Sequence, residues 1–134
     1  MDADYKELTG EIIKAAFRVH NVLGAGFLEK VYHNAMLIEM KEMGLHVVSQ
    51  YPADVYYKGH QVEEYCVDLM VENCILLELK AIVHLMPIHE TQLVNYLNAT
   101  RIDHGLLINF GASVTMKHKY RTYQKQSNKN KPEQ

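Results

Sequence analysis

The segment from Val67 to Lys80 constrains the fold of this chain more than any other part of the sequence. Two short apolar runs flank Glu72 and Asn73, and this arrangement predicts a β-hairpin with its turn at those two residues. Successive residues of a strand point to opposite faces of the sheet. One face of the hairpin is therefore apolar, and its residues are Val67, Leu69, Val71, Ile75, Leu77 and Leu79. The opposite face carries the charged side chains of the two predicted strands.

These charged residues are Asp68, Glu78 and Lys80. If the turn is centred on Asn73, Asp68 and Glu78 are equally far from the centre and stand directly opposite each other. Directly opposed residues have Cβ atoms about 4.5–5.5 Å apart, and two carboxylates at that separation repel each other in apolar surroundings. A hard divalent cation such as Mg²⁺ would neutralise them. The pattern therefore predicts a metal site, with Lys80 beside it to orient water or to stabilise charge on a phosphate oxygen.

A second interpretation of these three residues is that they are exposed and take no part in chemistry. An acidic residue followed by the sequence ExK occurs often by chance, and Lys80 would then form an ion pair with a solvent-facing acid. The surrounding sequence ILLELKA favours the metal site, because apolar strands seldom carry charges without a reason. Both interpretations stand at this point.

The rest of the chain contains both helical and strand patterns. Apolar residues recur at helical spacing before residue 44, whereas β-branched and aromatic residues dominate the segment that follows. We expect helices over residues 4–22, 27–43 and 87–100, and strands over residues 47–57, 61–71, 74–81, 105–110 and 114–123. Pro52 interrupts the first strand, and Pro87 opens the last helix. This order predicts an α/β domain with a mixed β-sheet flanked by helices.

Length and composition predict one folded domain. Residues 1–123 would form it, and residues 124–134 would be a polar, basic tail too poor in apolar residues to fold. The chain has no apolar run long enough to cross a membrane, and its acidic start differs from a secretory signal. We therefore expect a cytoplasmic protein with no membrane partner. Cys66 and Cys74 are then expected to be reduced, small, buried hydrophobic residues.

Charge is distributed unevenly along the chain. Residues 1–114 contain 8 Lys and Arg against 15 Asp and Glu, whereas residues 115–134 contain 6 Lys and Arg against 1 Asp or Glu. A basic end on an acidic body can contact nucleic acid, or it can simply keep that end solvated. A contact with phosphate is an open alternative for Lys117, Lys119 and Arg121.

Several short motifs occur together in this chain. The segment from Gly26 to Tyr32 has the pattern GxxExxY, with His20 and Leu23-Gly24 just before it. It is followed in order by Asp68-Leu69, Glu78-Leu79-Lys80, the residues His89, Gln92 and Tyr96, and the sequence GLLINFG at Gly105–Gly111. In this order and spacing the motifs resemble the GxxExxY protein family, which lies within the PD-(D/E)xK nuclease superfamily. The resemblance covers about residues 5–122.

The resemblance implies a restriction-endonuclease-like core and a phosphodiester hydrolase site that depends on Mg²⁺ or Mn²⁺. Asp68 and Glu78 match the acids that bind the metal, and Lys80 matches the catalytic lysine. Glu29 matches the helix-borne acid of the family, whose implied role is to hold the metal or a water on it. The backbone carbonyl of Leu79 is a further candidate metal ligand.

Three more residues are candidates for supporting the site or positioning the substrate. Gln92 and Tyr96 resemble the QxxxY helix motif of exonuclease-like members, and the alternative for them is an ordinary polar helix face. Tyr32 shares a helix side with Glu29, but a core aromatic with a satisfied hydroxyl is the favoured interpretation.

The histidines are expected to have packing or solvated roles. His20 is predicted to be partly buried in the core, with catalysis the less favoured role. The spacing of His33, His84 and His89 matches no zinc motif, so metal binding is the less favoured role for these three as well.

Together these residues predict a metal-dependent nuclease that hydrolyses phosphodiester bonds, with DNA favoured over RNA as its partner. Two alternatives are a non-catalytic nuclease-fold module that binds nucleic acid, and a protein-interaction module whose acids are merely exposed. The complete acid, acid and lysine set argues against the first alternative. The acidic body gives some support to the second, because it grips phosphate weakly. A homodimer or an accessory protein would supply a larger binding surface.

Overall fold

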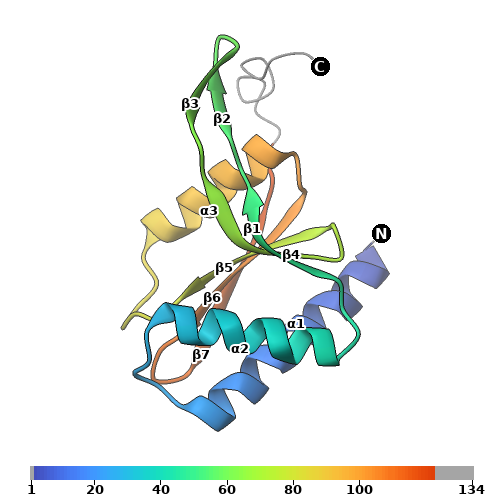
Figure 1. Ribbon diagram of the computed structural model, residues 1–134, viewed down its shortest axis with the longest axis vertical. Coiled ribbons are helices and arrows are strands. Elements are labelled where there is room, and N and C mark those ends of the chain that lie inside the picture. The colour runs from blue at the N-terminus through green and yellow to red at the C-terminus, as the bar shows by residue number, and fades with distance from the viewer. Residues whose placement is uncertain (1, 123–134) are drawn as a thin grey trace.

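The computed structural model describes residues 2–122, in which helices and strands form a layered α/β arrangement (Figure 1). The helices are α1 (Asp2–Leu23), α2 (Glu29–Glu42) and α3 (Pro87–Thr100). The strands are β1 (Val47–Pro52), β2 (Val55–Tyr57), β3 (His60–Glu63), β4 (Cys66–Val71), β5 (Ile75–Lys80), β6 (His104–Phe110) and β7 (Val114–Tyr120).

Five of these strands form the central sheet, in the order β1-β4-β5-β6-β7. Neighbouring strands are antiparallel except β5 and β6, which are parallel and are joined by α3. A parallel pair needs a crossover connection to bring the chain back to the same end of the sheet, and α3 is that connection. The predicted α/β class with a mixed sheet is therefore confirmed.

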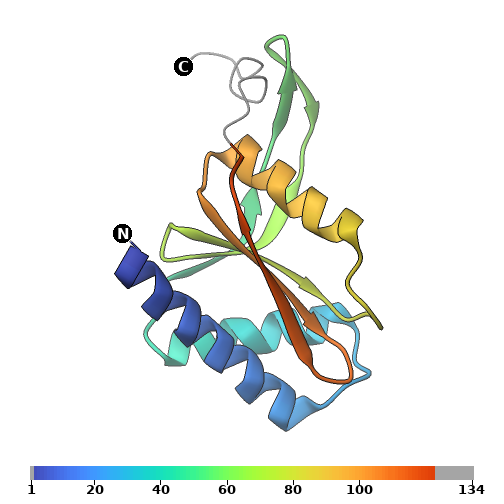
Figure 2. The same cartoon turned by 180° about the vertical axis from the view of Figure 1, so that it is seen from behind.

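Helices cover both faces of the central sheet. Figure 1 and Figure 2 show α1 and α2 together on one face and α3 on the other. The core beneath α1 and α2 includes Ile12, Met36 and Leu77. The core beneath α3 includes Leu76 and Leu93. Because its successive residues alternate between the two faces, β5 contributes to both cores and is apolar over most of its length.

The second sheet consists of β2 and β3 and projects from the ends of β1 and β4 (Figure 1). The sequence predicts a strand over residues 47–57 that Pro52 interrupts, and this interruption is confirmed by the end of β1 at Pro52. The unbroken strand predicted over residues 61–71 is instead divided into β3 and β4, because the chain leaves the main sheet near Tyr65. Pro52 has no N–H to continue the ladder, and the Ala53 N–H donates to the Tyr65 carbonyl at 2.6 Å.

The predicted helices are confirmed, with shifts of one or two residues at some ends. Helix α2 begins at Glu29 because Leu28 has an extended backbone, with φ −68° and ψ 153°. In the loop before it, Gly24 and Gly26 have φ values of 71° and 103°, a region that glycine adopts at little cost. Glu29 is therefore the first residue of α2, at the positive end of the helix dipole.

Two predictions about β4 are wrong. The sequence places Val67 on the same face as Leu69, but Val67 packs in the core beneath α3. The backbone is irregular here, because Gln50 of the neighbouring strand β1 has a left-handed φ of 59°. Cys66 is exposed rather than buried, because it lies where β4 emerges from the main sheet, and Cys74 is half-buried. Both thiols are free, as expected.

The last predicted strand is confirmed as β7, which ends at Tyr120 rather than at residue 123. The predicted tail of residues 124–134 lies outside the described residues. None of the described helices is long and apolar enough to cross a membrane.

Candidate active site

The hairpin of β4 and β5 has the register that the sequence predicts. Its pairs are Val71↔Ile75, Met70↔Leu76 and Leu69↔Leu77, all centred on Asn73. Glu72 and Asn73 have φ values of 52° and 55°, as the two central residues of a type I′ turn require. The next opposed positions along the strands belong to Asp68 and Glu78.

At these positions the two carboxylates accept hydrogen bonds from backbone N–H groups of the opposite strand. The Asp68 N–H donates to Glu78 Oε1 at 3.0 Å, and the Leu79 N–H donates to Asp68 Oδ2 at 2.7 Å. Each acid therefore binds the backbone of the opposite strand, and the two carboxylates are held together between the strands. Glu78 is only 5% exposed. A solvent-facing role for Glu78 is therefore wrong.

Two stacked tyrosines support Glu78: Tyr96, which the motif analysis names, and Tyr65, which it misses. The Tyr65 hydroxyl donates to Glu78 Oε2 at 3.2 Å. The ring of Tyr65 stacks on that of Tyr96 from α3, with centroids 3.9 Å apart and planes 10° from parallel. Tyr96 thus contacts the residue that binds Glu78. Tyr65 stands alone in a polar stretch, so no periodicity or motif marks it in the sequence.

Burial raises the pKa values of both acids, and the charge of Asp68 raises that of Glu78 further. Desolvation is the largest cause for Glu78, followed by the negative charge of Asp68, and together they raise the pKa of Glu78 to about 7. Desolvation also raises the pKa of Asp68, opposed by the hydrogen bond from Leu79 and by the charges of His33 and Lys80. The pair therefore carries negative charge that the surrounding protein neutralises only in part.

Glu29 approaches this pair from α2. Partial desolvation raises the pKa of Glu29, the charge of Asp68 raises it further, and Lys80 lowers it. Glu29 and Asp68 line a common cavity of about 370 Å³ between α2, β1 and β4. Asp68 therefore interacts with one acid from each of two other elements, Glu29 of α2 and Glu78 of β5.

The end of β5 positions Lys80 within reach of the acids. Lys80 lies beside Asn109 in the parallel ladder of β5 and β6. The Asn109 side chain, which is 2% exposed, accepts from the Ile82 N–H at 3.0 Å and donates to the Ile82 carbonyl at 2.9 Å. This two-bond clip holds the chain just after Lys80. The charge of Lys80 lowers the pKa values of Glu29, Asp68 and Glu78.

Comparison with known proteins identifies the superfamily of this chain. The family model of the PD-(D/E)XK nuclease superfamily matches residues 6–123. The chain belongs to this superfamily. Its mixed sheet with helices on both faces is consistent with the restriction-endonuclease-like fold.

A solved structure supports the fold of this PD-(D/E)XK protein. The crystal structure of SSO0001 is similar with a TM-score of 0.54 and 17% sequence identity, over 92% of this chain and 61% of that chain. At that identity the likeness concerns the fold alone, and the chain spans about three fifths of the length of SSO0001. A comparison with curated proteins gave no match.

In this PD-(D/E)XK chain, Tyr32 is a core residue that fixes the loop before Glu29. Its side chain is fully buried and stacks on Phe110, with centroids 4.6 Å apart. Its hydroxyl donates to the Gly24 carbonyl at 2.6 Å and accepts from the Phe27 N–H at 3.2 Å. Any support that Tyr32 gives to the site therefore acts through this loop rather than through contact with substrate.

The polar residues of α3 have different surroundings. Gln92 is exposed, one helical turn before Tyr96. His89 belongs to the start of the helix, because its Nδ1 accepts from the Met86 N–H at 2.9 Å. His84 is exposed, and His20 is half-buried with Nε2 at 2.9 Å from the Gly111 carbonyl. The predicted packing and solvated roles of these three histidines are confirmed.

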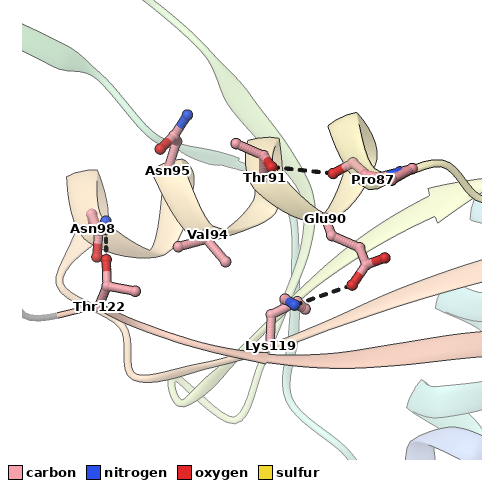
Figure 3. Close-up of a pocket in the computed structure, with 8 residues that line it drawn as sticks. All are labelled: Pro87, Glu90, Thr91, Val94, Asn95, Asn98, Lys119 and Thr122. Atoms are coloured by element: carbon pink, nitrogen blue, oxygen red, sulfur yellow. Dashed lines mark hydrogen bonds and ion pairs between the residues drawn. The ribbon is translucent and has the colours of Figure 1, made fainter.

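Two of the three basic residues near the end of β7 are engaged with acids. Lys119 lies 3.1 Å from Glu90 in a groove between α3 and β7 (Figure 3), and Arg121 lies 2.9 Å from Asp103. Lys117 is exposed. A contact with phosphate by Lys119 or Arg121 would have to compete with these ion pairs.

The donor set fits a hard divalent cation that keeps much of its water. Within residues 2–122, no three His, Cys, Asp or Glu side chains are arranged to hold a metal by themselves. Asp68 and Glu78 nevertheless form a desolvated acid pair whose pKa values a cation would lower. Mg²⁺ is typically held by one or two carboxylates, with waters and substrate phosphates completing its coordination. The two carboxylates therefore suit Mg²⁺ better than Zn²⁺.

Proposed function

We propose that this chain is a metal-dependent nuclease that hydrolyses phosphodiester bonds, in DNA more readily than in RNA. The observation that carries the proposal is the acid pair of buried Glu78 and half-buried Asp68, each of which binds the backbone of the opposite strand. The superfamily to which the chain belongs supports the reaction class. The GxxExxY pattern at residues 26–32 supports assignment to that branch of the superfamily.

In this proposal the chain contributes four side chains to catalysis. Asp68 and Glu78 hold Mg²⁺ or Mn²⁺, with the Leu79 carbonyl as a further ligand, and the cation supplies Lewis-acid stabilisation and a more acidic water. The Lys80 ammonium stabilises negative charge on the phosphate and orients the attacking water. Glu29 accepts a hydrogen bond from a water in the site and keeps it in place.

The remaining residues position these groups. Tyr65 holds the Glu78 carboxylate, and Tyr96 keeps the ring of Tyr65 in place by stacking on it. Gln92, exposed on the same helix, is available to contact substrate. Because the body of the chain is acidic, a second copy of the chain or an accessory protein would strengthen the grip on nucleic acid.

The test is a cleavage assay with the purified protein on linear, circular and single-stranded DNA and on RNA, with Mg²⁺, Mn²⁺ or EDTA. We expect cleavage that requires the metal. Lys80→Ala should lower its rate by about 10²–10³-fold, the loss typical when a group that stabilises transition-state charge is removed. Glu78→Ala should abolish it, and Lys41→Ala, at the far end of α2, should leave it unchanged.

Full activity of a folded Lys80→Ala protein would contradict the role given to this lysine. A folded wild-type protein that binds Mn²⁺ and nucleic acid but cuts none of these substrates would favour the non-catalytic binding module. A protein that binds neither would favour the interaction module.

A further inference from the structure

The cavity beside Asp68 contains more than the acids of the proposed reaction. Its lining residues are Glu29, Lys30, His33, Asn34, Ser49, Gln50 and Asp68. One wall comes from the first two turns of α2, and the other from β1 and β4. Apart from the two acids, each of these side chains can donate a hydrogen bond. The cavity, called the chamber below, is therefore polar, with an acid on each wall among hydrogen-bond donors.

His33 is fixed in this chamber by a contact between two elements. Its Nε2 lies 2.9 Å from Ser49 Oγ, which ties α2 to β1. This hydrogen bond holds the His33 ring beside β1. The imidazole lines the same cavity as Asp68 and Glu29.

Gln50 shows backbone strain at the rim of the same chamber. Its φ of 59° is a left-handed conformation that non-glycine residues rarely adopt. It lies between the pairs Ser49↔Leu69 and Tyr51↔Val67, opposite Asp68. Strained residues of this kind cluster at functional sites, where the surrounding structure maintains them. The strain thus falls on a residue of the chamber, beside the acid pair.

We propose that this chamber binds a backbone phosphate of the nucleic acid, next to the phosphodiester that is cut, through Lys30, His33 and Ser49. The inference rests on the proposed nuclease function and adds a substrate contact to it. Lys30 and Glu29 are consecutive on α2, so the chamber presents a cation for phosphate next to an acid directed at the reacting centre.

The test measures DNA binding in EDTA, so that it does not depend on cleavage. A fluorescein-labelled oligonucleotide, single-stranded and as a duplex, is titrated with wild type, Lys30→Gln and His33→Ala over a range of salt concentrations. Lys30→Gln should weaken binding roughly fivefold at low salt, to a similar extent for different sequences. It should also lower the slope of log K against log salt concentration by about 0.7–0.9, the value for one lost phosphate contact. A merely structural role would not change that slope.

Lys41→Gln is the matched control, because it removes the same charge from the exposed far end of the same helix. Binding by Lys41→Gln should match wild type. His33→Ala should weaken binding while its circular dichroism spectrum stays that of wild type. Because Lys30 is exposed, Lys30→Gln remains informative even if His33→Ala fails to fold.

Unchanged affinity and slope for Lys30→Gln would overturn the inference, as would a wild-type protein that binds neither probe. The proposed nuclease function is tested separately, by the cleavage assay in Mg²⁺ or Mn²⁺. Loss of binding in Lys30→Gln together with no cleavage by wild type would support the phosphate contact and contradict the nuclease.

Discussion

At the scale of single residues, the hydroxyl of Tyr65 connects the folded core to the chemistry of Glu78. It donates to Glu78 Oε2 at 3.2 Å and lowers the pKa of this buried carboxyl, against the larger effects of desolvation and Asp68. A hydrogen bond to a charged group contributes about 1.5–3 kcal/mol. The ionised form of Glu78, which a cation requires, therefore depends partly on this hydroxyl.

Tyr65→Phe should shift the acid limb of the pH–activity profile to higher pH by roughly one pH unit, because each unit corresponds to about 1.4 kcal/mol. The stack on Tyr96 remains, and activity well above pH 8 should approach that of wild type. Tyr56→Phe, which removes a hydroxyl bonded to Gln61 on the projecting ribbon, is the control. Identical pH profiles for wild type and Tyr65→Phe would show that Tyr65 does not act through Glu78.

Glu78 itself should make the stability of the metal-free protein depend on pH. Its pKa is raised from 4.5 to about 7, so the folded state favours the protonated form. The stability due to this preference is complete below pH 4.5 and is lost as pH rises through about 7. At pH 8 the free energy of unfolding of Glu78→Gln should therefore be higher than that of wild type, by on the order of 3 kcal/mol.

Urea denaturation in EDTA at pH 5 and pH 8 measures this difference. The advantage of Glu78→Gln should be much smaller at pH 5. An equal difference in free energy of unfolding at pH 5 and at pH 8 would mean that ionisation of Glu78 does not destabilise the folded protein.

At the scale of elements, the active site depends on how β5 ends. The Asn109 clip holds Ile82, and Gly111 leaves room for it, because a Cβ at Gly111 would lie 3.1 Å from the Ile82 carbonyl oxygen. The Gly111 carbonyl in turn bonds to His20 of α1. The sequence GLLINFG thus combines a buried strand with the residues that fix the chain after Lys80.

Asn109→Ala should destabilise the protein by about 2 kcal/mol, because it leaves the partly buried N–H and carbonyl of Ile82 without the Asn109 side chain as their partner. Cleavage should fall as well, since the segment after Lys80 is released. Thermal unfolding and the cleavage assay check both effects. Asn95→Ala on the exposed surface of α3 should cost less than about 0.5 kcal/mol. Asn109→Ala with the stability of wild type would show that the clip is dispensable.

The sequence predicted the elements with strong local signals and missed contacts that only the fold creates. The register of β4 and β5 was predictable because apolar residues alternate on both sides of one turn. The wrong face of Val67 and the unforeseen break between β3 and β4 both arise where the chain leaves the main sheet. Tyr65 was missed because its partners Glu78 and Tyr96 belong to other elements, β5 and α3, and come near it only in the folded chain.

At the scale of the whole molecule, the described fold and the family match both end near residue 122. The family model covers residues 6–123, and the described core lies within residues 2–122. The folded body is acidic, and the remaining residues carry an excess of lysine. We propose that residues 1–123 fold on their own and that the rest contributes charge.

A chain that ends at Tyr123 should unfold at the same temperature as the full chain, because every described core residue is kept. It should bind DNA more weakly at low salt and show a smaller salt dependence, since Lys125, Lys129 and Lys131 are lost together with only one acid. Differential scanning calorimetry and the binding titration test these outcomes. A clear drop in unfolding temperature would place the domain boundary later in the chain.

The central claim is that Asp68 and Glu78 together form a divalent metal site. The most direct measurement is a calorimetric titration of Mn²⁺ into the wild-type protein, into Asp68→Asn and into Ser49→Ala as a neighbouring control. We predict one site per chain in wild type and in Ser49→Ala, and none in Asp68→Asn although it remains folded. Equal Mn²⁺ binding by wild type and Asp68→Asn, or no binding by wild type, would contradict the claim.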